Sequence, residues 1–124
     1  MKELTIKGTR QNPNIILNKE KNIFEFSGQS LPENVQKLYQ PILSWIDEYS
    51  DAPNDNTSIV FKMKYYNSAS SKVIFEVLKK FNLIYKKGKN VKVEWYFKEE
   101  DEDMQESGKY YQELLDMPFN FHSL

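Results

Sequence analysis

The chain has 124 residues, of which 40% are hydrophobic and 28% are charged, a composition typical of a single compact domain over residues 1–124. Its 17 basic and 18 acidic residues give a formal net charge of −1, which predicts no general attraction to nucleic acid or to a membrane surface. With no cysteine and one histidine, the chain cannot form disulfides, thiolate metal sites or multi-histidine sites, so we expect no metal or cofactor.

The amino-terminal residues, Met1 to Lys7, alternate charged and apolar side chains and lack the apolar core of a signal peptide. No stretch reaches the roughly 20 apolar residues of a membrane-spanning helix. Together with the absence of cysteine, these features predict a cytoplasmic protein.

The first part of the chain is predicted to form short antiparallel strands. Apolar residues gather in short segments that are separated by turns rich in Asn, Pro and Lys. The segments are Leu4 to Lys7, Ile15 to Asn18 and Ile23 to Ser27.

A helix is predicted after these strands. Ser30 and Glu33 have the spacing of a capping box, in which each side chain bonds the backbone amide of the other residue. One apolar stripe at helical spacing follows, made of Val35, Leu38, Ile42, Trp45 and Tyr49. Because Pro41 has no amide hydrogen, we expect a kink or a break into two helices near Gln40.

Two strand–helix–strand units come next. Alternating apolar residues predict strands over 59–65 and 91–97, and in the first of them Tyr65 is expected to face the core and Tyr66 the opposite side. Helical spacing over 73–84 predicts a helix between them. Strands that are joined by a helix in this way pair in parallel.

The end of the chain continues the same pattern. The acidic run 99–103 suits the amino terminus of a helix, which we expect to end before Pro118. Phe119 and Phe121 then alternate with polar residues and predict a short final strand. The outward residues of the two clearest strands are mostly polar, so we predict an α/β fold with a mixed five- or six-stranded sheet and three main helices packed mainly on one face.

The segment that points to function lies between the strand at 59–65 and the helix that follows it. It reads Tyr65-Tyr66-Asn67-Ser68-Ala69-Ser70-Ser71-Lys72 and gathers three serine hydroxyls at one helix amino terminus. Ordinary capping accounts for one such residue, because Asn and Ser accept from the free amides of a first turn. Phosphorylation is the functional interpretation, since this position favours an anion.

Four segments spread over nearly the whole chain combine into one pattern. They are the octet at 65–72, the opening Ile6-Lys7-Gly8-Thr9 with Asn12-Pro13, the stretch Gly28-x-Ser30-x-Pro32-Glu33-Asn34, and the closing Met117-Pro118-Phe119. Together they resemble the SiaC family of bacterial regulatory phosphoproteins. The resemblance implies a fold similar to that of the STAS-domain anti-sigma-factor antagonists.

The resemblance also implies that the hydroxyl after Tyr-x-Asn is phosphorylated, and by position this hydroxyl belongs to Ser68. The best-known member carries threonine there with serine next to it, whereas this chain has Ser68 followed by Ala69. Ser70 and Ser71 stay open as alternative sites. The expected partner-binding rim consists of Tyr65, Tyr66, Asn67, Ala69, Ser70, Ser71 and Lys72.

The partners implied by the resemblance are enzymes. They are a histidine-kinase-like ATPase that acts as a serine/threonine kinase, a metal-dependent serine/threonine phosphatase, and a diguanylate cyclase that the unphosphorylated form activates. The chain itself is then expected to be no enzyme and to act in cyclic di-GMP signalling and biofilm regulation. We expect Tyr66, Asn67 and Lys72 to matter most for docking.

Other interpretations of the sequence stay open. A small enzyme or ligand-binding domain could use the same strand ends, and a plain interaction module would keep the rim without the phosphate. The lysines at 79, 80, 86, 87, 89 and 92 resemble a nucleic-acid patch, but no arginine joins them. The acidic run 99–103 invites a calcium interpretation but lacks the glycine of an EF-hand loop.

Overall fold

The computed structural model describes residues 1–124 and consists of one six-stranded sheet and three helices. The strands are β1 (Leu4–Ile6), β2 (Asn14–Asn18), β3 (Ile23–Ser30), β4 (Asn56–Tyr66), β5 (Asn90–Phe97) and β6 (Phe119–Ser123). The helices are α1 (Val35–Tyr49), α2 (Ser68–Lys86) and α3 (Glu102–Leu114). The predicted α/β class is confirmed, with the larger of the two expected strand numbers.

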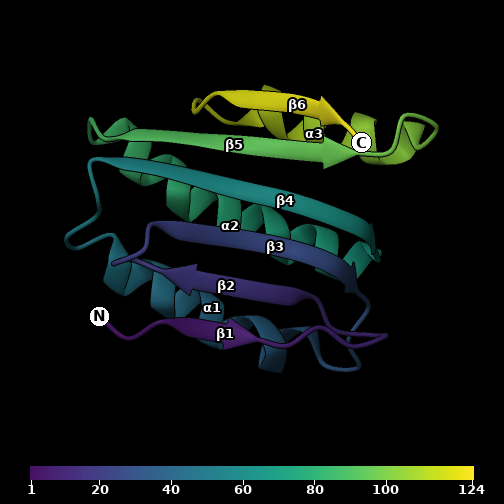
Figure 1. Ribbon diagram of the computed structural model, residues 1–124, viewed down its shortest axis with the longest axis horizontal. Coiled ribbons are helices and arrows are strands. Elements are labelled where there is room, and N and C mark those ends of the chain that lie inside the picture. Colours follow the sequence, from purple (N-terminus) through teal and green to yellow (C-terminus); the bar gives the residue numbers. More distant parts are fainter.

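The sheet is mixed, and its strands lie side by side in chain order from β1 to β6 (Figure 1). The pairs β1–β2 and β2–β3 are antiparallel, as the short opening segments predict. The pairs β3–β4, β4–β5 and β5–β6 are parallel, each joined by one helix. The carboxyl ends of β3, β4 and β5 therefore meet at one edge of the sheet.

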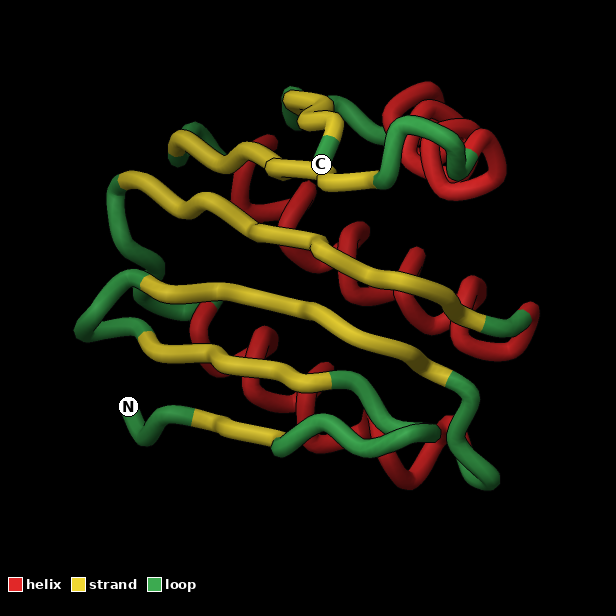
Figure 2. Tube along the Cα trace, turned by 45° about the vertical axis from the view of Figure 1, so that its right-hand side comes forward, coloured by secondary structure: helices red, strands yellow, loops and turns green.

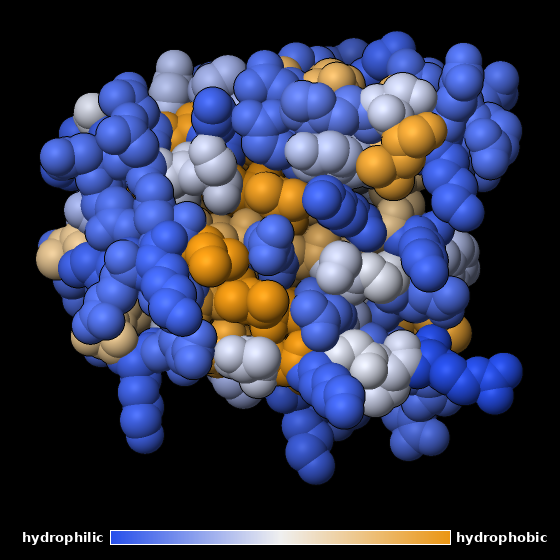
Figure 3. Space-filling model, in the orientation of Figure 1, coloured by the Kyte–Doolittle hydropathy of each residue, from blue (hydrophilic) through white to orange (hydrophobic).

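All three helices cover the same face of the sheet, which is the rear face in Figure 1 and remains so in the turned view of Figure 2. The opposite face is uncovered, as the polar outward residues predict. Figure 3 views this open face, where an apolar area lies at the middle of the sheet among hydrophilic side chains. Half-buried Ile16, Ile23 and Val60 belong to the outward side of β2, β3 and β4 by their register.

The core between sheet and helices is rich in aromatic rings. Phe26 of β3 and Phe61 of β4 stack with ring centroids 4.6 Å apart and planes 5° from parallel. Trp95 of β5 is 1% exposed and donates its indole Nε1–H to the carbonyl of Met104 at the start of α3, at 3.0 Å. Such rings bury large apolar areas, and the indole bond also orients α3 on the sheet.

The predicted capping box at Ser30 is wrong. Helix α1 is capped by Asn34, whose side chain accepts from the Lys37 amide at 3.0 Å. Ser30 is instead the last residue of β3 and has the same parity as Phe24 and Phe26, so its side chain faces the core.

The predicted break at Pro41 is also wrong, because α1 runs through it as one helix. Pro41 lies on the exposed side of the helix, and so does Lys37, whose carbonyl loses its usual partner there. Water can satisfy that carbonyl. The apolar stripe on the opposite side of α1 packs against the core, and this packing keeps the helix continuous through Pro41.

No helix of the structure is both long and apolar enough to cross a membrane.

Candidate functional site

The Asn67–Ser68 turn joins the carboxyl end of β4 to the start of α2. Asn67 is the N-cap of α2, and its side-chain oxygen accepts from the Ser70 amide at 2.9 Å. Its own amide donates to the carbonyl of Ser30 at 3.1 Å, which ties the turn to the end of β3. Asn67 thus performs the capping that a helix start requires, and the serines that follow need not share in it.

The three serines of the first turn occupy different environments. Ser68 is exposed, and its hydroxyl makes no hydrogen bond within the chain. Ser70 is fully buried and Ser71 is half-buried. The Ser71 hydroxyl lies 3.1 Å from the hydroxyl of Tyr111, which itself donates to the Ser71 carbonyl at 2.9 Å. Of the three, Ser68 alone presents a free hydroxyl to solvent.

A buried hydroxyl network holds the turn from below. The Ser70 Oγ donates to the Ser30 carbonyl at 2.9 Å and lies 2.8 Å from the Ser30 Oγ. The Ser30 Oγ in turn lies 2.8 Å from the hydroxyl of Tyr39 in α1. Burial raises the pKa of Tyr39 to about 12, so its hydroxyl stays neutral. The network joins β3, α1 and α2 beneath Ser68, and the sequence interpretation missed it by assigning Ser30 to a cap.

The expected orientation of the tyrosine pair is wrong. Tyr65 is the exposed residue, at 52%, whereas Tyr66 is half-buried and packs against the core. The cause is a shift in the β3–β4 register, in which Met63 pairs with Gly28 and Tyr65 pairs with Gln29. Lys64 is therefore an extra residue on β4, and one extra residue turns every later side chain to the other face.

Tyr66 lies at the junction of β4 with α3. Its hydroxyl is buried and makes no hydrogen bond of ordinary geometry, although Ser107 and Tyr111 lie close enough to affect its pKa. Burial raises the pKa of Tyr66, and nearby Tyr111 raises it further. Burial also raises the pKa of Tyr111, whose ring stacks on Phe75 of α2. Tyr66 is thus a packing residue under the rim, and Tyr65 is the aromatic side chain that a partner can reach.

Lysines flank the Ser68 turn in the sequence. Residues 61–73 include lysines at 62, 64 and 72 and no acidic residue. Lys64 and Lys72 are exposed and form no ion pair, whereas Lys62 lies over the Tyr96 ring at 4.6 Å. Ala69 is also exposed. Tyr65, Ser68, Ala69 and Lys72 are thus the exposed residues of the predicted rim.

The lysine cluster near the carboxyl end of α2 is mostly neutralised by ion pairs within the chain. Its paired lysines are Lys79 with Glu76, Lys80 with Asp47, Lys86 with Asp116, Lys89 with Asp55, and Lys92 with Glu94. Because these lysines pair with carboxylates of the chain, we interpret them as ordinary surface charges rather than as a nucleic-acid patch. The acidic run also has a local role, since Asp101 caps α3 by accepting from the Met104 amide at 3.0 Å.

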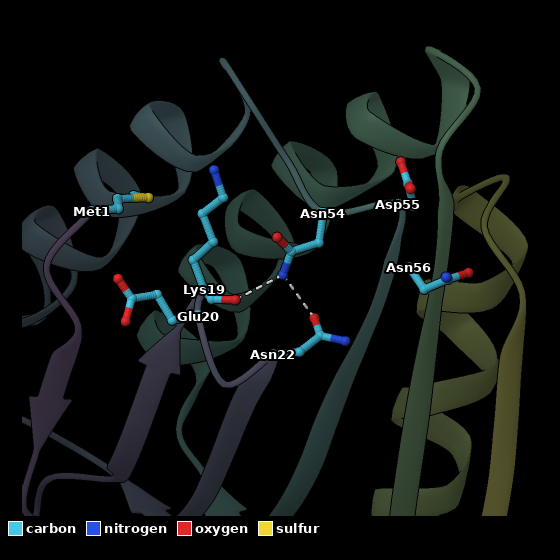
Figure 4. A pocket seen from close by; sticks show the side chains of 7 residues that line it. All are labelled: Met1, Lys19, Glu20, Asn22, Asn54, Asp55 and Asn56. Carbon is cyan, nitrogen blue, oxygen red and sulfur yellow. Dashed lines mark hydrogen bonds between the residues drawn. The ribbon is translucent and has the colours of Figure 1, made fainter.

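Two hollows are lined by residues outside the Ser68 turn. One, of about 450 Å³, lies at the opposite end of β4, where the Asn54 side chain bonds the Lys19 carbonyl and the Asn22 side chain (Figure 4). The other, of about 700 Å³, lies at the carboxyl edge, where Arg10 and Gln29 line it without any carboxylate or histidine. The first hollow is lined by charged side chains, Lys19, Glu20 and Asp55, of which Asp55 is paired with Lys89 at 2.9 Å.

Comparison with known proteins decides the family. Residues 6–124 match the family described as SiaC family regulatory phosphoprotein. The chain belongs to the SiaC family. A curated relative, an uncharacterized protein of Pseudomonas aeruginosa, is 23% identical over 119 residues, which cover 96% of this chain and 94% of that protein.

Solved SiaC structures confirm the fold. The apo form of SiaC from Pseudomonas aeruginosa superposes with a TM-score of 0.89 at 22% identity and covers 99% of this chain and 100% of that one. SiaC in complex with the diguanylate cyclase SiaD, which it activates, gives a TM-score of 0.90 at 22% identity and covers 98% and 99% of the two chains. The SiaC family thus includes an activator of a diguanylate cyclase, and its members are regulatory phosphoproteins.

Proposed function

We propose that this chain is a non-enzymatic phospho-switch protein that is reversibly phosphorylated on Ser68 and that binds and activates a diguanylate cyclase when unphosphorylated. One observation carries the choice of residue: Ser68 is the exposed, unbonded hydroxyl of the first turn of α2. Ser70 is buried among hydroxyls and the Ser71 hydroxyl lies against Tyr111. A kinase can reach Ser68 without unfolding the turn.

A phosphate on Ser68 would change the rim without disturbing the fold. It adds about −1.5 to −2 charges at the amino terminus of α2, where the free amides and the helix dipole favour an anion. The capping bond from the Ser70 amide to Asn67 leaves Ser68 uninvolved. The phosphate therefore adds negative charge to a surface that carries Lys64 and Lys72, while the core stays intact.

The partners follow from family membership. The activation of SiaD by SiaC supports a diguanylate cyclase as the effector. We propose a histidine-kinase-like ATPase as the serine kinase and a metal-dependent phosphatase as its opponent, all acting in the cytoplasm, where ATP and GTP are available. Residues 61–75 contain no histidine or carboxylate that could act as a base beside Ser68, which favours a regulatory protein over an enzyme.

Phosphosite mapping tests the proposal. The purified chain is incubated with the host kinase and ATP, and its intact mass and peptides are measured by mass spectrometry. We expect one phosphoryl group on the wild type and on the matched control Ser71→Ala, located at residue 68, and none on Ser68→Ala. A wild type that gains no phosphate from the host kinase, or a Ser68→Ala variant that still gains one, contradicts the proposal.

A further inference from the structure

A groove of about 350 Å³ lies between α1 and α2 directly beside the Ser68 turn. Its apolar lining comes from both helices and consists of Val35, Leu43, Ala69 and Val73. Val35 and Leu43 are only partly buried, although both pack against the core. The groove therefore leaves apolar surface in contact with water next to the proposed phosphorylation site.

One uncompensated positive charge stands on the groove. The charged residues that line it are Lys72 and Glu76. Glu76 is already paired with Lys79 at 2.9 Å. Lys72 is exposed and pairs with no carboxylate of the chain. The groove thus combines an apolar floor with a free cation at its Ser68 end.

We propose that this groove is the docking site for an acidic segment of the effector. In the unphosphorylated chain Lys72 pairs with a carboxylate of that segment, and after phosphorylation it exchanges this partner for the phosphate of Ser68. This inference rests on the proposed function. Apolar side chains of the segment pack against Val35, Leu43 and Val73, while one carboxylate pairs with Lys72. Charge complementarity at such a surface speeds association and selects the partner.

The spacing on α2 explains why phosphorylation would release the effector. Ser68 and Lys72 are four residues apart and therefore neighbours on one helix face. A phosphate on Ser68 can pair with Lys72 within the chain, and charge-assisted bonds of this kind are among the stronger ones. Ala69 and Lys72 both line the groove, so the same phosphate also repels an incoming carboxylate.

Binding measurements on matched lysine variants test the groove. The probe is the purified host diguanylate cyclase whose activity the unphosphorylated chain raises, and its affinity for each variant is measured by calorimetry. We expect Lys72→Glu to weaken binding at least about tenfold. Lys87→Glu, which alters another exposed and unpaired lysine at the far end of α2, should change it less than about twofold. Ala69→Trp, which fills the groove from an exposed position, should also weaken binding.

The outcomes separate the two proposals. If phosphorylation of Ser68 releases the cyclase but Lys72→Glu and Ala69→Trp bind as tightly as the wild type, the groove is the wrong surface and the phospho-switch stands. If phosphorylation of Ser68 leaves the affinity unchanged, the proposed function itself is wrong.

A second measurement tests the phosphate–lysine contact without any partner. The second pKa of a phosphoserine, ordinarily about 6, is read from ³¹P NMR of the Ser68-phosphorylated chain over a pH series. A cation beside the phosphate favours the dianion, so Lys72→Gln should raise this pKa and Lys87→Gln should leave it unchanged. Equal pKa values in the wild type and in Lys72→Gln contradict the exchange.

Discussion

Ser68, Ser70 and Ser71 stand within one helical turn, yet each hydroxyl has a different chemical role. Asn67 supplies the cap, Ser70 joins the buried network with Ser30, and Ser71 contacts Tyr111. Ser68 is left with no structural role that the fold depends on. A residue that carries a regulatory group needs this freedom, because its modification must change a surface without unfolding the chain.

Stability measurements should separate Ser70 from Ser68. Ser70→Ala removes a buried hydroxyl that bonds both the Oγ and the carbonyl of Ser30, so it should cost about 1–3 kcal/mol of unfolding free energy. Ser68→Ala should leave that free energy unchanged, since the Ser68 hydroxyl bonds nothing in the chain. Urea denaturation of both variants measures the difference. A large loss for Ser68→Ala would show that Ser68 is a structural serine.

Stability should respond in opposite ways to loss of the Tyr66 hydroxyl and of the Tyr111 hydroxyl, which both lie beneath the rim. Tyr66→Phe removes a buried hydroxyl that makes no hydrogen bond of ordinary geometry, so it should be neutral or stabilise the fold by up to about 1 kcal/mol. Tyr111→Phe removes the bond to the Ser71 carbonyl and should cost about 1 kcal/mol. Thermal unfolding of the pair checks both directions. Destabilisation by Tyr66→Phe would mean that its hydroxyl has a bonding partner.

At the scale of elements, α3 is held on the sheet by a close contact at one glycine. A Cβ added at Gly108 would lie 2.6 Å from the Trp95 Nε1 and 2.7 Å from a ring carbon of Phe121. Both rings belong to neighbouring strands, β5 and β6. The close approach keeps α3 against the sheet near Tyr66, so it also shapes the floor under the rim.

Gly108→Ala should therefore destabilise the protein, although alanine favours a helix over glycine by up to about 1 kcal/mol. We expect a net loss of about 1–3 kcal/mol, because α3 must move away from two packed rings. Lys109→Ala, one residue along on the exposed side, is the control and should change little. Denaturant unfolding followed by tryptophan fluorescence reports both, and equal stability of the two variants would contradict the close packing.

At the scale of the whole molecule, local periodicity was enough to predict the class, the parallel units and the single covered face. Two predictions were wrong where the orientation of a side chain depends on contacts between residues far apart in the chain. The extra residue at Lys64 is visible only when β4 is paired with β3, so the orientations expected for Tyr65 and Tyr66 were the reverse of those observed. Ser30 meets Ser70 across 40 positions of sequence, a contact that no local motif encodes.

The candidate site was predictable in part. Its place at a strand end before a helix follows from the change in hydrophobic period between β4 and α2. The choice among three serines does not, because burial of Ser70 depends on packing against β3 and α1. The parity of Ser30 with Phe24 and Phe26 was the available signal that this serine faces inward.

Stability of the molecule should fall at acid pH through a cluster on the open face. Partial burial raises the pKa of Glu94, but bonds to His122 and Asn120 and the charge of Lys92 outweigh it and hold the pKa below its usual 4.5. A carboxylate whose pKa is lowered by folding stabilises the protein at pH values above its pKa in the unfolded chain. This stabilisation is lost as pH falls through its pKa in the folded protein. Lys62 and Tyr96 pack beside this cluster.

Glu94→Gln should remove this pH dependence. The variant should be less stable than the wild type above pH 4.5, and the gap should narrow as pH falls below that value. Chemical denaturation of both proteins over a pH series measures the gap. A gap that stays constant or widens toward acid pH would be inconsistent with a lowered pKa of Glu94.

The central claim is that phosphate on Ser68 turns off an activator. The most direct test compares two forms of the full chain, one with serine and one with phosphoserine at position 68, added to the responsive host diguanylate cyclase and GTP. The rate of cyclic di-GMP formation is followed by chromatography. The account predicts a raised rate with the serine form and the basal rate with the phosphoserine form, whereas equal activation by both forms would contradict it.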